Sequence, residues 1–255
     1  MQEQEAKTAS VFGVRFATVS MAEAMDFIDR AVAPTASKKS FCAFVNADCL
    51  NQAYNDREYA ETLQSADQVW ADGIGVAIAA RYVGSPVSEN VNGTDMFPLL
   101  CQSGHRIFLL GGRPGVAEKA RERAMQQFPE ASIIGAEHGY FGDDAAAVIA
   151  RIDAAAPDIL LVGLGVPRQE FWIRDHLEQL NCRLAIGVGG LFDFASGRIK
   201  RAPLWMRKVK LEWLYRLYQE PIRLFKRYVL GNPLFLWRVI INGKKNRHPD
   251  LTTTK

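Results

Sequence analysis

The stretch DILLVGLGVPRQEFWIRDH, residues 158–176, decides how the rest of the chain is interpreted. Its residues 159–162 are wholly apolar, which predicts a short strand that is covered on both faces. Gly163 and Gly165 permit a tight turn, and Pro167 suits the first position of a helix. The stretch therefore predicts a strand, a glycine turn and a helix N-terminus, where free backbone N–H groups can bind an anion. Such a turn can equally be a plain connection.

The same alternation continues on both sides of this stretch. We predict further strands at 11–16, 41–45, 68–71, 106–110, 133–134 and 184–188, and helices at 21–33, 49–64, 73–82, 95–103, 116–128 and 144–155. Strands that alternate with helices predict an α/β fold with βαβ units and a largely parallel sheet. In such sheets, ligands bind at the edge where the strands have their carboxyl ends.

Length and composition bound the class of protein. The 255 residues have the composition of a soluble globular protein, which excludes disordered and fibrous classes. The sequence has no apolar run of about 18 residues, so we expect no spanning helix. The first ten residues are polar and do not resemble a signal peptide. Four scattered cysteines without a CxxC pair indicate reduced, buried thiols in a cytosolic protein, and no zinc site.

The net charge of +3 conceals a division within the chain. Between residues 198 and 247 there are 14 Lys and Arg against two acids, whereas the remainder is about −9. We therefore expect a core at 11–197 and a basic helical appendage at 198–247. The segments 1–10 and 248–255 are expected to be disordered tails. A basic appendage favours an anionic surface or ligand.

The appendage is also amphipathic. Trp, Leu, Met, Val and Tyr recur at helical spacing over residues 205–218, interleaved with Lys and Arg, and Pro221 starts a further helix. Basic helices rich in Trp, Phe and Leu are typical of a membrane interface. The alternative is a helical layer that packs on the core with its charges in water.

Polar residues follow several predicted strands: Asn46, Asp48, Asp72, Asn92, Asp95, Arg113, Gln169, Glu170 and Asp193. Asp72 follows an apolar strand and precedes two glycines. A carboxylate there could accept a proton from an attacking hydroxyl, or it could serve only as the N-cap of the helix at 73–82.

A second glycine turn, Gly111–Gly115, could bind a diphosphate through its amides, with Arg113 adding charge. It matches neither GxGxxG nor the P-loop pattern. Glu137 lies near the end of the next strand, where a dehydrogenase holds the ribose of NAD, so that alternative stays open. The sequence shows no Ser-His-Asp order, no HExxH and no DxD.

Seven segments together resemble one family, the WecG/TagA/CpsF bacterial glycosyltransferases (glycosyltransferase family 26). They are FVNAD (44–48), ADGIG (71–75), NGTD (92–95), FLLGG (108–112), VGLGVPRQEFW (162–172), GVGGLFDFASG (187–197) and RAPLWMRKVKLEWLYRLYQEPIRLFKRYV (201–229). They stand in family order and cover nearly the whole chain. One departure is Asp48, where relatives often have Glu.

The resemblance implies a Rossmann-like core with a basic C-terminal appendage, the GT-E arrangement. It implies an inverting hexosyltransferase that moves a hexose or N-acetylhexosamine-type sugar from a UDP-sugar to a polyprenyl-diphosphate-linked saccharide. The bond is typically β-1,4, and the product serves surface or exopolysaccharide biosynthesis. We expect a cytoplasmic protein, peripheral on the inner face of the membrane. No motif requires a divalent metal or other cofactor, and no nucleic acid is expected.

The resemblance also assigns residues. Asp72 is the expected general base, and Asn46 would position a sugar. The UDP-sugar would be bound by Gly111, Gly112, Arg113, Tyr140, Gly163, Gly165, Arg168, Gln169, Glu170, Gly189 and Asp193. Acceptor, diphosphate or membrane would be contacted by Asn92, Thr94, Asp95, Arg207, Arg216, Arg223 and Arg227. The alternatives are an NAD-dependent oxidoreductase, a non-catalytic membrane-binding module and a nucleic-acid binder, although phosphate-tracking surfaces do not need so many Leu, Trp and Phe.

Overall fold

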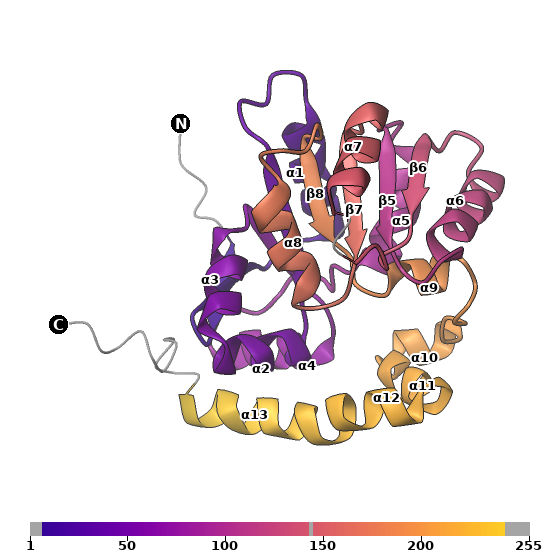
Figure 1. Cartoon of the computed structure of the whole chain (residues 1–255). Coiled ribbons are helices and arrows are strands. Elements are labelled where there is room, and N and C mark those ends of the chain that lie inside the picture. Colours follow the sequence, from indigo (N-terminus) through magenta and orange to yellow (C-terminus); the bar gives the residue numbers. More distant parts are fainter. Residues whose placement is uncertain (1–6, 143–144, 243–255) are drawn as a thin grey trace. The chain divides into compact units, whose positions relative to one another are not determined.

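The computed structural model describes residues 7–142 and 145–242 (Figure 1). Its strands are β1 (Thr8–Val11), β2 (Val14–Ala17), β3 (Ser40–Val45), β4 (Gln68–Ala71), β5 (Ile107–Gly111), β6 (Ile133–Glu137), β7 (Ile159–Gly163) and β8 (Leu184–Gly187). They form one sheet in the order β1-β2-β4-β3-β8-β7-β5-β6. β1 and β2 pair in antiparallel orientation, whereas β2–β4, β3–β8, β5–β6, β5–β7 and β7–β8 are parallel pairs. The predicted α/β fold with a largely parallel, Rossmann-like sheet is confirmed.

Helices connect the strands, as the alternating pattern predicts. They are α1 (Met21–Val32), α2 (Ala47–Asn55), α3 (Arg57–Ser65), α4 (Ile74–Tyr82), α5 (Gly93–Gln102), α6 (Val116–Gln127), α7 (Ala145–Ala155), α8 (Arg168–His176) and α9 (Leu191–Ala195). The C-terminal part forms α10 (Leu204–Lys208), α11 (Glu212–Gln219), α12 (Pro221–Phe225), a π-helical turn η1 (Lys226–Leu230) and α13 (Gly231–Asn242).

Contacts divide the chain into two compact units. Unit 1 comprises residues 1–21, 44–92 and 201–255, and unit 2 comprises 22–43 and 93–200. Each unit is therefore assembled from separate stretches, and the C-terminal helices belong to unit 1. The division into a core and an appendage after residue 197, which the charge pattern suggests, stays a prediction about their roles.

Three details of unit 1 differ from the predictions. The single strand expected at 11–16 is a hairpin of β1 and β2, because Phe12 and Gly13 turn the chain with φ of 55° and 83°. The helix expected at 49–64 is two helices, since Asp56 is extended and accepts a bond from the Tyr59 N–H at the start of α3. Thr8 lies in a strand, so the expected disorder of 1–10 is wrong for its last residues. Residues 1–6 and 248–255 lie outside the described part.

The last helix of unit 1 has a buried face. In Figure 1, α13 runs along α2 and α4, and these helices are in contact. Phe235 and Val239 are buried, and the ring of Phe235 meets that of Phe12 at 5.9 Å. Asn51 adds hydrogen bonds, because its side-chain amide donates to the Gly231 carbonyl at 2.8 Å and accepts from Arg238. The face of α13 that carries Phe235 and Val239 is therefore part of the core of unit 1.

Unit 2 holds the parallel strands that position the glycine turns. β7 pairs with β5 and β8 in a register that sets Gly163 beside Gly111. Every residue of β5 and the first four of β7 are buried, as the apolar run at 159–162 predicts. The strands consequently end together, and the turns that follow them lie along one edge of this unit. All four cysteines of the chain are free and buried, as predicted.

Candidate functional site

The first candidate residue of unit 1 is Asn46, which directly follows β3. It is the N-cap of α2, and its Oδ1 atom accepts hydrogen bonds from the backbone N–H groups of Asp48 and Cys49 at 3.0 and 3.2 Å. An asparagine favours this position because its oxygen satisfies N–H groups that have no partner within the helix. Since Oδ1 is committed to the cap, any contact of Asn46 with a sugar would fall to its Nδ2 group.

Asp72 follows β4 directly and stands before the N-terminus of α4. Its N–H donates to the carbonyl of Val45 at 2.8 Å, which ties the end of β4 to the end of β3. The N-cap of α4 is Gly73, with φ of 93°, and not Asp72. The alternative in which Asp72 serves only as the N-cap is therefore wrong, because Gly73 occupies that position. Gly73 has the positive φ that a non-glycine residue rarely adopts.

Arg227 joins the same neighbourhood from η1. Its Nε atom lies 3.5 Å from Oδ2 of Asp48, which also accepts a hydrogen bond from Gln52. Burial by itself lowers the pKa of the Arg227 guanidinium. Four nearby groups outweigh that effect and raise the pKa above its ordinary value: Tyr228, Cys49, Asp48 and Asp72. Within unit 1, a permanent cation thus lies in the field of Asp72 and Asp48.

The family resemblance assigned no role to two residues of this neighbourhood. Asp48 is the ion partner of Arg227, and the side-chain oxygen of Asn90 accepts a hydrogen bond from the Gly73 N–H. Asp48 carries a signal in the sequence, because it belongs to the FVNAD segment and follows a strand. Asn90 lies in a polar loop and carries no such signal.

The other predicted acceptor residues are more scattered. Arg223 pairs with Glu220 one helical turn away, at 2.9 Å, and is largely exposed. Arg207 and Arg216 lie on α10 and α11. Asn92 is buried at the end of a unit 1 segment, and Thr94 and Asp95 lie in the first turn of α5 in unit 2. Arg227, by contrast, pairs with Asp48, which directly precedes Cys49 in the first turn of α2.

In unit 2, three glycine turns pack directly against one another. The Gly112 N–H donates to the Gly163 carbonyl at 3.1 Å, and a side chain on Gly111 would collide with that carbonyl. A Cβ atom on Gly163 would lie 2.8 Å from the carbonyl oxygen of Gly189. The structure therefore brings the predicted Gly111, Gly112, Gly163 and Gly189 together at the ends of β5, β7 and β8. Only glycines permit this approach.

Gln169 and Glu170 support the Gly189 turn through hydrogen bonds. The Gly189 N–H donates to Oε1 of Gln169 at 2.9 Å, and Nε2 of Gln169 donates to Oε1 of Glu170 at 2.7 Å. Glu170 is 0 % exposed, and its other carboxyl oxygen has no hydrogen-bond partner among the described residues. Burial raises the pKa of Glu170 to about 7, despite the opposing hydrogen bonds from the Gln169 side chain and its own backbone N–H. Both side chains are buried, and the bonds described here show them supporting the Gly189 turn.

The remaining predicted donor residues lie nearer the surface. Arg113 and Tyr140 are exposed, Gly165 turns the chain with φ of 83°, and the Arg168 guanidinium lies over the Phe141 ring at 5.6 Å. Asp193 lies in the first turn of α9, where its carboxylate is 2.6 Å from Nε of Arg198. A ligand that reaches Asp193 therefore meets an existing ion pair.

Glu137, on which the dehydrogenase alternative depends, also has partners. Its carboxylate lies 2.7 Å from Nε of Arg151 and 3.8 Å from His138. A ribose hydroxyl would have to compete with Arg151 for this carboxylate. The observation weighs against a nicotinamide cofactor at this position.

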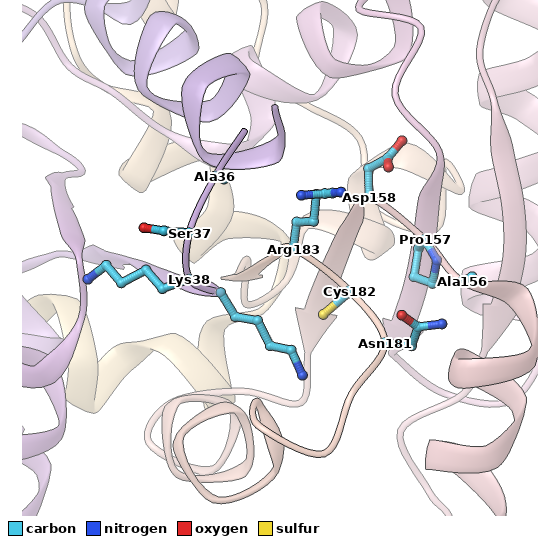
Figure 2. A pocket seen from close by; sticks show the side chains of 10 residues that line it. Ala36, Ser37, Lys38, Ala156, Pro157, Asp158, Asn181, Cys182 and Arg183 are labelled. Carbon is cyan, nitrogen blue, oxygen red and sulfur yellow. The ribbon is translucent and has the colours of Figure 1, made fainter. Parts of the chain in front are cut away.

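A cavity of about 320 Å³ lies elsewhere in unit 2, at the amino ends of β3, β7 and β8 (Figure 2). Two of its basic side chains donate hydrogen bonds to carbonyls that follow helices. Lys39 Nζ donates to the carbonyls of Glu178 and Leu180 behind α8, and Arg183 donates to the Ala33 carbonyl behind α1. Cations stabilise the negative end of a helix dipole, so this cluster has a structural explanation.

Among the described residues, no group of three or more His, Cys, Asp or Glu side chains is arranged to hold a metal ion. Among the helices of the same residues, none combines the length and the apolar character that crossing a bilayer requires.

Comparisons with known proteins agree on one family. Residues 9–249 match the model of the "Glycosyl transferase WecG/TagA/CpsF family". A protein of Bacillus spizizenii named N-acetylglucosaminyldiphosphoundecaprenol N-acetyl-beta-D-mannosaminyltransferase is 33% identical over 220 residues, 85% of this chain and 84% of that protein. A Staphylococcus aureus protein of the same name is 30% identical over 243 residues, 93% of this chain and 94% of its own length.

Proposed function

Because the chain belongs to the WecG/TagA/CpsF family of glycosyltransferases, we propose that it transfers a sugar from a UDP-sugar to a polyprenyl-diphosphate-linked saccharide. The sugar is a hexose or an N-acetylhexosamine, and transfer inverts its anomeric configuration, typically forming a β-1,4 bond. The names of the two relatives specify an N-acetylmannosaminyl group and an N-acetylglucosaminyl-diphosphoundecaprenol acceptor, which makes these the first substrates to try.

The observation that carries the mechanism is the cluster around Asp72 in unit 1. Asp72 takes the proton of the acceptor hydroxyl as that oxygen forms its bond to C1 of the donor sugar. The bond from C1 to the diphosphate oxygen breaks, and UDP leaves with the electron pair. Three observations support this role: Asp72 directly follows a buried strand, it precedes the cap residue of α4, and its charge helps to raise the pKa of Arg227.

Arg227 is the residue that we assign to the acceptor's diphosphate. An arginine that remains charged and partly buried can give charge-assisted hydrogen bonds to phosphate oxygens. Asp48 lies 3.5 Å from its Nε atom, and a guanidinium carries further N–H donors that can bind phosphate oxygens. Asn46 caps the helix on which Asp48 lies and positions the sugar through its Nδ2 group.

The donor binds to the glycine turns of unit 2. Backbone N–H groups at the ends of β5 and β7 can stabilise the charge that develops on the departing UDP. Gly111, Gly112, Gly163, Gly165 and Gly189 form the surface that the diphosphate approaches. Arg113, Tyr140, Arg168 and Asp193 surround it, and Gln169 and Glu170 support it from below.

The C-terminal helices bring the protein to the cytoplasmic face of the membrane. Large apolar side chains are exposed on them, including Trp205, Ile222 and Trp237, and the segment is strongly basic. Apolar side chains enter the interface, while Lys and Arg contribute about 1 kcal/mol each with anionic lipids. A peripheral enzyme can reach its lipid-linked acceptor in this way and serve polysaccharide assembly.

A calorimetric titration of the purified protein tests the proposed donor. UDP and a panel of UDP-sugars are titrated in parallel with NAD. Saturable binding of UDP and tighter binding of one UDP-sugar, with none of NAD, is the expected result. Binding of NAD but of no UDP-sugar would contradict the proposal and return attention to Glu137.

A further inference from the structure

Helix α4 is apolar on both of its faces. Its sequence, IGVAIAARY, contains a single charged residue, Arg81. Val76, Ala79 and Ala80 form the buried face, whereas Ile74, Ile78 and Tyr82 are 36 %, 46 % and 40 % exposed. A helix that is hydrophobic all round is normally buried or in contact with lipid. The exposure of these large apolar side chains on the outer face of α4 is therefore not explained by packing within the protein.

The exposed residues form one stripe along the helix. Ile74, Ile78 and Tyr82 are each four positions apart, so they lie on the same face over about 12 Å of helix axis. We name these three residues the α4 stripe. The opposite face is fixed tightly: a Cβ atom on Gly75 would lie 3.1 Å from the Cβ atom of Ala47 and 3.9 Å from the Phe235 ring.

Within unit 1, one end of the α4 stripe lies next to the Asp72 turn and the other end contacts α13. Its first residue, Ile74, is two positions after Asp72, the proposed base. At its other end the Tyr82 hydroxyl donates to the backbone carbonyl of Ile240 at 3.2 Å. Ile240 is 62 % exposed, and Ile241 and Trp237 beside it on α13 are also exposed. The stripe therefore connects the Asp72 turn with the apolar outer face of α13.

We propose that the α4 stripe binds the first isoprene units of the acceptor's polyprenyl chain. The inference rests on the proposed function, because it supposes an acceptor with a diphosphate and a long apolar chain. Arg227 supplies the positive charge that a diphosphate needs. Its Nε atom lies 3.5 Å from Oδ2 of Asp48, and the Asp72 N–H donates to the carbonyl of Val45, three residues before Asp48. Because Ile74 stands two residues after Asp72, the α4 stripe begins next to the turn that an acceptor's reacting sugar has to reach.

The surface chemistry of the stripe favours an apolar chain over a polar ligand. Its side chains offer aliphatic and aromatic carbon, and the Tyr82 hydroxyl is already bonded to Ile240. A second copy of the protein is the competing occupant, since exposed apolar patches also serve self-association. The continuity with Ile240, Ile241 and Trp237 favours a chain that emerges from the membrane.

The test compares two acceptors that carry the same diphosphate and sugar, one on a polyprenyl chain and one on a short alkyl chain. Both are assayed in detergent, so that binding to a bilayer does not limit the rate. The variant is Ile78→Glu, with Ile78→Ser as a milder second variant and Ile78→Leu as the conservative one. Leu99→Glu on α5 is the matched control, because Leu99 is 40 % exposed in unit 2.

We expect Ile78→Glu to raise KM for the polyprenyl acceptor at least tenfold and Ile78→Ser to raise it less. KM for the short-chain acceptor and for the UDP-sugar should stay within twofold of wild type. Ile78→Leu and Leu99→Glu should behave as wild type with both acceptors. Circular dichroism and thermal unfolding check that each variant is folded.

Equal KM values for the polyprenyl acceptor in wild type, Ile78→Glu and Ile78→Ser would overturn the inference, as would an equal loss with both acceptors. A change from dimer to monomer by light scattering, without a change in KM, would assign the stripe to self-association instead. Those results leave the proposed function intact, because wild type still transfers sugar. Wild type that transfers to neither acceptor would contradict the proposed function itself, and the inference with it.

Discussion

The Nε atom of Arg227 lies 3.5 Å from Oδ2 of Asp48, and this ion pair joins the C-terminal helices to the first turn of α2. The pair links two of the family's segments, FVNAD and the long basic segment at 201–229. Charge density alone did not distinguish Arg227 from its neighbours. The ion pair does, because it fixes this guanidinium beside the first turn of α2, and Asp72 is among the groups that raise its pKa.

Replacement of Arg227 should therefore cost more activity than replacement of its neighbour on the same segment. Arg227→Met should lower kcat/KM for the lipid-linked acceptor about tenfold or more, the scale of one lost charge-assisted hydrogen bond. Arg223→Met is the matched control, since Arg223 is exposed and pairs with Glu220 on its own segment. Steady-state kinetics with varied acceptor measures both, and equal losses would contradict the assignment of Arg227 to the diphosphate.

Removal of the proposed base should affect turnover and spare folding. Asp72→Asn should lower kcat at least about 100-fold, the usual scale for a lost general base. UDP affinity should be unchanged. Because Gly73 and not Asp72 is the N-cap of α4, the melting temperature should change little. A variant with near-normal turnover and a lower melting temperature would show that Asp72 is structural.

The buried carboxyl of Glu170 should make stability depend on pH. Its pKa is raised from 4.5 to about 7, so the folded state binds a proton more tightly than the unfolded state between these values. Stability therefore falls as pH rises through this window, by about 3 kcal/mol in total. Glu170→Gln keeps the acceptor for Gln169 and removes the charge.

Thermal unfolding of wild type and Glu170→Gln at pH 5 and pH 8 measures this effect. The variant should exceed wild type in stability at pH 8, and the difference should nearly vanish at pH 5. A variant that is equally less stable at both values would contradict the buried-charge explanation. It would instead assign the carboxyl an essential hydrogen bond.

The glycine turns of unit 2 should respond unequally to a methyl group. Gly165→Ala introduces only the strain of a positive φ, and should cost about 1–2 kcal/mol, because no atom lies within 4 Å of the added Cβ. Gly111→Ala adds a collision with the Gly163 carbonyl to its own positive φ. Denaturant unfolding should show the larger loss for Gly111→Ala, and UDP titration should show weaker binding. Equal losses would mean that the turns are not closely packed.

Much of the fold can be predicted from local patterns. The apolar run at 159–162, the glycine turn and the helix that follows it are confirmed, as are α1, α6 and the buried state of the cysteines. Two errors had local causes that the apolar pattern does not show. Phe12 adopts a positive φ that few non-glycine residues take, and Asp56 interrupts a helix by capping the next one.

The candidate site could be predicted in part. The glycines of unit 2 converge as the parallel strands require, and Asp72 stands at a strand end. The buried positions of Gln169 and Glu170, and the pairing of Asp48 with Arg227, depend on contacts between distant segments. No spacing in the sequence specifies such contacts. The same holds for α4, whose small apolar residues gave no sign of which face is buried.

A product assay tests most directly whether the protein transfers a sugar to a lipid-linked acceptor. The purified protein is incubated with polyprenyl-diphosphate-linked N-acetylglucosamine and single UDP-sugars, and the lipid product is analysed by mass spectrometry and NMR. We predict a product heavier by one sugar residue, with inverted configuration at C1, formed with one donor and at least about 100-fold more slowly by Asp72→Asn. No product from any UDP-sugar, or equal rates for wild type and Asp72→Asn, would contradict the account.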